Sequence, residues 1–210
     1  MITVAISQRV EEFSDRNETR DALDQRWPAF VREVDAVPMP VPNRLATSDS
    51  LDENFRELQI WLSAVRPQAI ILTGGDDPGI HPMRDRTENA LINYARKGGL
   101  PLLGICRGMQ MLALAEGASL KPVAGHIAIR HRVTGVIARE VNSYHGLALG
   151  SCPMNYEILA SDSAGEIEAI KHNHLPWEGW MWHPERETQF SADDLNRFGR
   201  LIGNTDRKPA

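Results

Sequence analysis

The stretch LLGICRGMQ, residues 102–110, carries the strongest structural signal in the chain. An apolar run typical of a buried strand stops at Cys106, and a helical pattern begins directly after it. Glycines stand two positions before and two positions after the cysteine. A sharp strand-to-helix turn needs such neighbours without side chains, and the arrangement is that of a nucleophile elbow with cysteine in place of serine. The stretch therefore predicts an α/β fold in which the Cys106 thiol projects from the turn.

The helix expected after Cys106 also bears on the chemistry of the thiol. A helix N-terminus offers partial positive charge and unpaired backbone N–H groups, which favour a thiolate and can lower a cysteine pKa from about 8.5 by one to several units. A structural cysteine buried in a glycine-flanked turn is the alternative. The strand, the glycines and the helix together favour a nucleophile.

On both sides of this stretch, short β-rich runs alternate with helical patterns. The alternation predicts a mainly parallel central sheet flanked by helices. A small antiparallel element is expected in the second half, where the pattern changes to several short strands over 132–170. Other expected strands are 3–7, 69–73, 100–105 and 180–182. Expected helices lie around 18–27, 51–65, 90–97, 107–113 and 191–202.

Two local signals add detail to this arrangement. The prolines at 38, 40 and 42 predict an extended connection, because proline fixes φ and lacks the backbone donor. Asp85 and Glu88 have the spacing of a capping box at the start of the helix over 90–97. A place at the border of a functional pocket is the alternative for these two carboxylates, and their roles stay open.

Length and composition predict one globular domain over residues 1–203, followed by a polar tail at 204–210. The formal charge of -5 is spread along the chain without a basic block, which argues against a nucleic-acid partner. No apolar run is long enough to cross a bilayer, and residues 1–6 lack the basic flank of a secretion signal. We therefore expect a cytoplasmic protein without a membrane partner.

Cys106 and Cys152 are the two cysteines, and their contexts differ. A disulfide is not expected between them in a domain of this size. A thiolate nucleophile needs a proton carrier and a group that orients it. His183 is the best placed of the seven histidines, because it follows the short strand expected over 180–182. Glu185, two residues later, can project to the same side and hold the imidazole.

The elbow at 102–110 and the segment Trp182-His183-Pro184-Glu185 together resemble the class I glutamine amidotransferase superfamily, and within it the γ-glutamyl hydrolase-like branch. The resemblance extends over nearly the whole chain, and includes the segments 72–78, 84–88 and 141–145. It implies a flavodoxin-like fold. It also implies hydrolysis of a γ-glutamyl amide through a cysteine thioester, with Cys106, His183 and Glu185 as the catalytic triad.

The same resemblance implies further roles. Backbone N–H groups of Gly75 and Arg107 would form the oxyanion hole, and the Gly74–Gly75 pair suits a close approach of the substrate carbonyl. Residues expected to bind the substrate are Gly74, Arg84, Gln110, Asn142, Ser143, Tyr144 and His145. An exposed polar helix face is the alternative for Gln110.

No cofactor or metal is expected. His172 and His174 have a spacing that suits a metal pair, but no Cys or carboxylate cluster completes the site in the sequence. His126, His131 and Arg130 could bind an acidic leaving group or lie in solvated loops, and their roles stay open.

The expected substrate is a small γ-glutamyl molecule. Residues 6–9, 20–27 and 181–187 resemble the γ-glutamyl-CDP-amidate hydrolases, which release cytidine diphosphoramidate and glutamate for the decoration of surface polysaccharide. A γ-glutamyl-γ-aminobutyrate hydrolase and the glutaminase subunit of an amidotransferase are alternatives. A diphosphate leaving group would need arginines such as Arg84, Arg107 or Arg130 at the mouth of the site. A homodimer and a synthetase partner both stay open.

Overall fold

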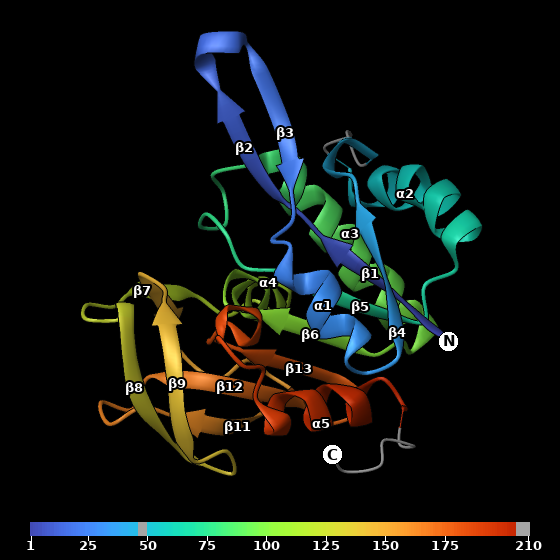
Figure 1. Cartoon of the computed structure of the whole chain (residues 1–210). Coiled ribbons are helices and arrows are strands. Elements are labelled where there is room, and N and C mark those ends of the chain that lie inside the picture. The colour runs from blue at the N-terminus through green and yellow to red at the C-terminus, as the bar shows by residue number, and fades with distance from the viewer. Residues whose placement is uncertain (46–49, 205–210) are drawn as a thin grey trace.

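The computed structural model describes residues 1–45 and 50–204 (Figure 1). Its centre is a sheet of nine strands, in the order β4-β1-β5-β6-β13-β12-β11-β8-β9. The first five pair in parallel: β4 (Ala36–Val41), β1 (Ile2–Ser7), β5 (Ala69–Leu72), β6 (Leu102–Ile105) and β13 (Trp177–Trp180). The other four pair antiparallel: β12 (Ile167–His172), β11 (Tyr156–Ser161), β8 (Ile127–Gly135) and β9 (Arg139–Tyr144). The expected parallel sheet is confirmed, and the antiparallel strands extend it.

Helices cover both faces of the parallel half (Figure 1). On one face lie α1 (Arg26–Arg32) and α5 (Ala192–Leu201), where the rings of Phe30 and Phe198 stack with centroids 5.7 Å apart. On the other lie α2 (Leu51–Val65), α3 (Pro82–Gly98) and α4 (Arg107–Ala115). Every residue of β5 and β6 is buried, as expected for strands with helices on both sides.

Shorter elements complete the described chain. Three 3₁₀ turns are η1 (Ser14–Arg16), η2 (Asn43–Leu45) and η3 (Pro184–Arg186). Two small antiparallel pairs join β2 (Arg9–Phe13) to β3 (Glu18–Ala22), and β7 (Leu120–Pro122) to β10 (Leu147–Leu149). None of the helices within the described ranges is long and apolar enough to span a bilayer.

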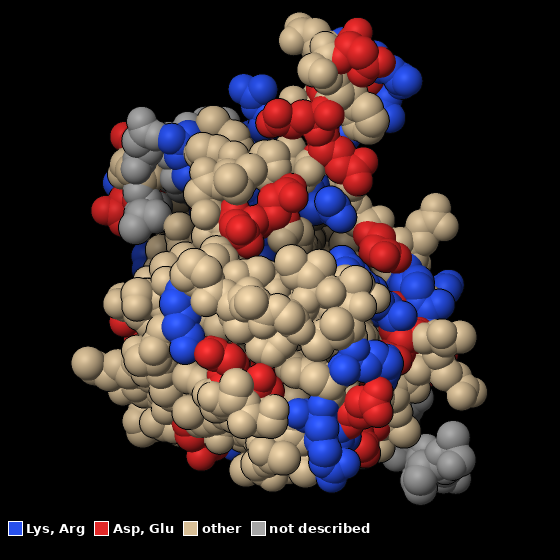
Figure 2. Space-filling model, turned by 90° about the vertical axis from the view of Figure 1, so that its left-hand side faces the viewer, with Lys and Arg blue, Asp and Glu red and all other residues tan. Residues whose placement is uncertain are grey.

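The helix expected around 18–27 is wrong in its first half. Residues 18–22 form β3, which pairs with β2 in a hairpin that projects from the body, and α1 begins only at Arg26. Polar residues suit this hairpin because both of its faces meet solvent; Glu18 and Arg20 pair at 2.6 Å. Acidic and basic side chains are interspersed on the hairpin in Figure 2.

Three other boundaries differ from the expectation. Pro38 and Pro40 lie inside β4, which tolerates them because it is an edge strand. The capping box is wrong: α3 begins at Pro82, so Asp85 and Glu88 lie inside the helix. Proline suits that first position because its missing N–H is not needed there. The strand β13 ends at Trp180, before the two residues that precede His183.

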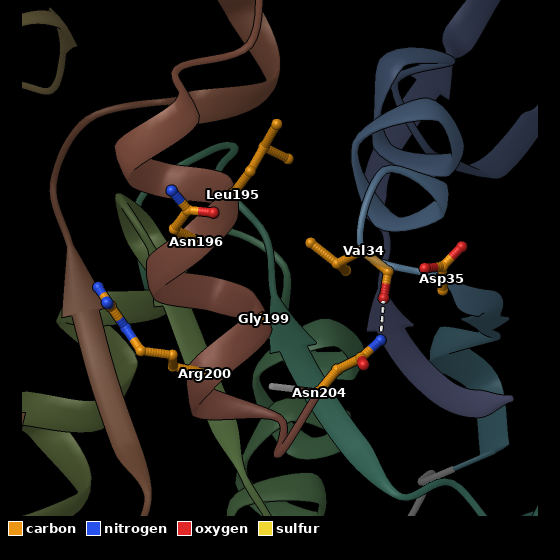
Figure 3. Close-up of a pocket in the computed structure, with 7 residues that line it drawn as sticks. All are labelled: Val34, Asp35, Leu195, Asn196, Gly199, Arg200 and Asn204. Carbon is orange, nitrogen blue, oxygen red and sulfur yellow. Dashed lines mark hydrogen bonds between the residues drawn. The ribbon is translucent and has the colours of Figure 1, made fainter. Parts of the chain in front are cut away.

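The end of the described chain is attached to the body. Asn204 donates from its side chain to the Val34 carbonyl at 2.6 Å and from its backbone to the Gly199 carbonyl at 2.8 Å. These contacts close one end of a cavity of 220 Å³ between α1 and α5, drawn in Figure 3. Asn204 is therefore not frayed, and the rest of the expected polar tail, 205–210, lies outside the described residues.

A buried carboxylate joins three elements beneath the elbow. Glu88 is completely buried and accepts from the Ser7 hydroxyl at 2.8 Å, from Arg84 Nε at 2.9 Å, and from Arg107 Nη1. Burial raises the pKa of Glu88, but the Arg107 and Arg84 guanidinium groups outweigh it and hold the pKa below its ordinary value. Glu88 is therefore ionised and ties β1, α3 and α4 together.

Replacing Glu88→Gln is expected to lower the free energy of unfolding by about 3–5 kcal/mol, because two buried guanidinium groups lose their shared anion. Urea unfolding followed by circular dichroism measures the change. Glu18→Gln, which breaks an exposed ion pair, serves as the matched control and should leave the midpoint unchanged. Equal midpoints for the two variants would show that the buried pair does not stabilise the fold.

Candidate active site

Cys106 lies at the junction of β6 and α4 with φ 51° and ψ -106°. A non-glycine residue in this region is strained, and such strain is typical of a nucleophile elbow. The backbone N–H of Cys106 donates to the Trp180 carbonyl at 2.7 Å, which fixes the turn against β13. The side chain is nearly buried, with 5% exposed.

The two flanking glycines are required by close packing around this turn. A Cβ on Gly104 would lie 2.6 Å from the carbonyl carbon of Gly108. A Cβ on Gly108 would lie 2.2 Å from the carbonyl oxygen of Leu72 on β5. The first turn of α4 therefore approaches both strands more closely than any side chain would allow.

His183 stands between the thiol and a carboxylate. Its Nδ1 lies 2.7 Å from Glu185 Oε1. Burial lowers the pKa of His183, but the Glu185 carboxylate and a hydrogen bond with the Cys106 thiol outweigh it and raise the pKa to about 9. The structure thus brings the three predicted groups into one thiol–imidazole–carboxylate series, which can move a proton to and from sulfur.

Backbone contacts hold His183 in place beyond the end of β13. Its N–H donates to Asn142 Oδ1 at 2.9 Å, and its carbonyl accepts from Asn142 Nδ2 at 2.8 Å. On the next turn, Arg26 Nε donates to the Glu185 carbonyl at 2.6 Å. A Cβ on Gly74 would lie 2.4 Å from His183 Cε1, so this glycine leaves room for the imidazole.

The two candidate oxyanion donors lie on either side of the elbow. Gly75 has φ 146°, and a Cβ there would lie 2.2 Å from Arg84 Nη1. The backbone N–H of Arg107 stands in the first turn of α4, where a helix leaves its N–H groups without partners. Arg84 Nη2 donates to the carbonyls of Thr73 and Gly74 at 2.8 and 2.9 Å, and so supports the loop that carries Gly75.

Several residues predicted to touch the substrate use their side chains internally. Arg84 lies under the Thr73–Gly75 loop, and Asn142 clamps His183. Ser143 Oγ donates to the His126 carbonyl at 2.7 Å, and His145 is buried with its Nδ1 3.1 Å from the Leu147 carbonyl. Contact with the substrate through these four side chains is therefore not supported.

Gln110 and Tyr144 remain candidates. Gln110 Nε2 donates to the Leu147 carbonyl at 2.9 Å, while its Oε1 is buried without a hydrogen-bond partner. Tyr144 is 42% exposed, and its ring stands edge-on to the His183 ring with centroids 5.7 Å apart. Arg186 also lies over the Tyr144 ring, 4.5 Å from its centroid.

Two arginines beside His183 were not expected from the sequence. Arg9 and Arg186 border a cavity of 40 Å³ that also touches Gly74, His183 and Glu185. Arg9 Nε is buried without a hydrogen-bond partner. Arg9 reaches this place because β2 runs past the end of β5, and the hairpin was not predicted. The only sequence signal was that both arginines lie in segments that resemble the γ-glutamyl-CDP-amidate hydrolases.

Known proteins resemble this chain over nearly its whole length. It is 34% identical to the γ-glutamyl-CDP-amidate hydrolase of Campylobacter jejuni over 192 residues, which cover 88% of this chain and 90% of that protein. It is 30% identical to a glutamine-hydrolysing GMP synthase subunit of Methanocaldococcus jannaschii over 173 residues, with 76% and 87% covered. The crystal structure of a GMP synthase subunit from Thermoplasma acidophilum shares the fold, with a TM-score of 0.70 at 20% identity and 98% and 94% covered.

The family model of class I glutamine amidotransferases matches residues 43–196, which contain the elbow and the His183–Glu185 pair. The match spans most of the chain and agrees with the fold. The chain therefore belongs to the class I glutamine amidotransferase family and is a cysteine amidohydrolase of that family.

Proposed function

We propose that this enzyme hydrolyses a γ-glutamyl amide through a thioester on Cys106. The observation that supports the proposal is the hydrogen-bonded series from the Cys106 thiol through His183 to Glu185 at a strained strand-to-helix turn. An imidazole in hydrogen-bond contact with a thiol can take its proton and later return it. The buried Glu185 carboxylate keeps Nδ1 as the donor side, so that Nε2 faces sulfur.

In the first half-reaction, Cys106 Sγ attacks the γ-carbonyl carbon and a tetrahedral oxyanion forms. The oxyanion accepts from the backbone N–H groups of Gly75 and Arg107, each contributing about 3 kcal/mol to transition-state stabilisation. The C–N bond then breaks, and the leaving nitrogen takes the proton held by His183. In the second half-reaction His183 deprotonates water, which attacks the thioester and releases glutamate and the free thiol.

For the leaving group we propose cytidine diphosphoramidate, so that γ-glutamyl-CDP-amidate is the substrate. The relative of that name from Campylobacter jejuni matches this chain over 90% of its own length. Arg9 and Arg186 beside His183 offer two cations to a diphosphate. The arginines expected for this task lie elsewhere: Arg84 and Arg107 are buried with Glu88, and Arg130 pairs with Glu140 and Glu187. A role in surface polysaccharide synthesis rests on the same likeness.

A glutaminase that supplies ammonia to a synthetase partner is the second candidate. It is favoured by the relatives that are GMP synthase subunits, one of which matches 76% of this chain at 30% identity. The two candidates share the thiol, imidazole and carboxylate. They differ in whether glutamine is turned over only with a second protein.

Incubation of the purified chain with γ-glutamyl-CDP-amidate, γ-glutamyl-γ-aminobutyrate and glutamine, assayed for free glutamate, separates the candidates. We expect fastest turnover of the nucleotide conjugate, and complete loss of turnover in Cys106→Ala. Cys152→Ala is the matched control, because this second thiol lies outside the site. Turnover that survives in Cys106→Ala would overturn the mechanism, and turnover of glutamine alone would overturn the substrate.

The pH dependence of kcat/KM should report the raised pKa of His183. Protonated His183 supplies the proton to the leaving nitrogen, so kcat/KM should fall as pH rises through about 9. Glu185→Gln removes the anion that raises this pKa, so the alkaline limb should move to lower pH. An unchanged limb in Glu185→Gln would show that the carboxylate does not act on the imidazole.

Arg186→Ala should raise KM for γ-glutamyl-CDP-amidate about tenfold or more, since a hydrogen bond to a charged group contributes about 1.5–3 kcal/mol. Its KM for γ-glutamyl-γ-aminobutyrate should change much less. Arg16→Ala, at the exposed tip of the hairpin, is the matched control. An equal change in KM for both substrates would exclude the diphosphate contact.

A further inference from the structure

A second cluster of chemically active side chains lies in the antiparallel half of the sheet. His126 precedes β8, His131 lies on β8, His145 follows β9, and Glu168 lies on β12. Pairing of β8 with β9 brings the first and third together, with the His145 N–H donating to the His126 carbonyl at 3.1 Å. The rings of His131 and His145 lie 5.0 and 4.8 Å from that of His126, centroid to centroid.

The cluster is buried, and its polar atoms lack hydrogen-bond partners. Glu168 is completely buried, His126 and His145 are nearly so, and the side chain of His131 is 13% exposed. Five buried atoms here have no hydrogen-bond partner: His126 Nδ1, His131 Nε2, His145 Nε2 and both carboxylate oxygens of Glu168. An unpartnered buried polar atom typically costs about 1–3 kcal/mol, so five in one cluster require an explanation.

The distances suit a shared cation. The ligand atoms of His126, His131 and Glu168 all lie within 4.8 Å of one another. His145 Nε2 is 3.4 Å from Glu168 Oε1, and His131 Nε2 is 3.6 Å from Glu168 Oε2. Neighbouring ligands of a tetrahedral zinc ion are separated by about 3.4 Å, given bonds of about 2.1 Å. Binding would draw the widest pair inward by roughly 1 Å.

The outer contacts fix the imidazoles for this task. His126 Nε2 lies 3.2 Å from Asp162 Oδ2, and His145 Nδ1 lies 3.1 Å from the Leu147 carbonyl. Each ring thus gives its N–H to an acceptor outside the cluster and directs its other nitrogen inward. Metal-binding histidines commonly have this arrangement, with a carboxylate or carbonyl behind the ring.

We propose that His126, His131, His145 and Glu168 bind one divalent transition-metal ion of the zinc class in a closed, structural site. Three imidazoles and a carboxylate are the ligand set that such an ion prefers over Mg²⁺ or Ca²⁺. Four protein ligands complete a tetrahedron, which is typical of structural sites and leaves no open position for chemistry. The expectation of a chain without metal considered only His172 and His174, and the structure assembles a different set.

Titration of the full-length Cys106→Ala protein with Co²⁺ tests the site, because the catalytic thiol is then removed as a competing ligand. After treatment with a chelator, we expect a saturable visible absorption of four-coordinate Co²⁺ at one ion per chain, displaced by Zn²⁺. His131→Gln in this background should weaken binding more than about 100-fold, whereas His174→Gln, at an exposed histidine, should bind as before.

Asp162→Asn keeps all four ligands and gives a second measurement if His131→Gln does not fold. It should retain the Co²⁺ absorption and bind about 10–100-fold more weakly. Absence of a saturable band, or a band that disappears when only Cys106 is replaced, would overturn the proposal. Equal affinity in Asp162→Asn and its parent would also overturn it.

Discussion

The ionised carboxylate of Glu88 is the constraint on which the arrangement of the site depends. It draws Arg84 from the same helix and Arg107 from the elbow helix into one buried ion cluster. Arg84 in turn holds the carbonyls of Thr73 and Gly74. One anion therefore sets the distance between the loop after β5 and the first turn of α4. Those two segments carry both backbone groups that we assign to the oxyanion hole.

The second half of the sheet supports the imidazole. His183 lies beyond the end of β13, where no ladder hydrogen bond can position it, and Asn142 on β9 holds both its N–H and its carbonyl. The antiparallel strands thus bring a side chain 41 residues away in sequence to the catalytic backbone. The histidine cluster lies among these same strands, directly after the segment that carries Asn142 and Tyr144.

The sequence predicted the centre of the molecule better than its periphery. Strand and helix on either side of Cys106 could be read because buried parallel strands are continuous apolar runs and the glycines mark the turn. The hairpin over residues 9–22 was missed, since a ribbon with two solvated faces has no apolar periodicity to detect. Asp85 and Glu88 were read as a helix cap because their local spacing fits one, whereas their actual partner, Arg107, lies on another helix. The histidine cluster combines positions from 126 to 168, and such long-range proximity is not encoded in any local spacing.

The prolines of β4 have a consequence for the outer edge of the sheet. Pro38 and Pro40 occupy alternate positions of a terminal strand whose inner side pairs with β1. Alternate residues of an edge strand present their amides outward, and proline has no amide hydrogen to present. An incoming strand from another molecule would find acceptors there without the matching donors. This margin is thus protected against edge-to-edge aggregation, a hazard that long, flat margins of open sheets otherwise carry.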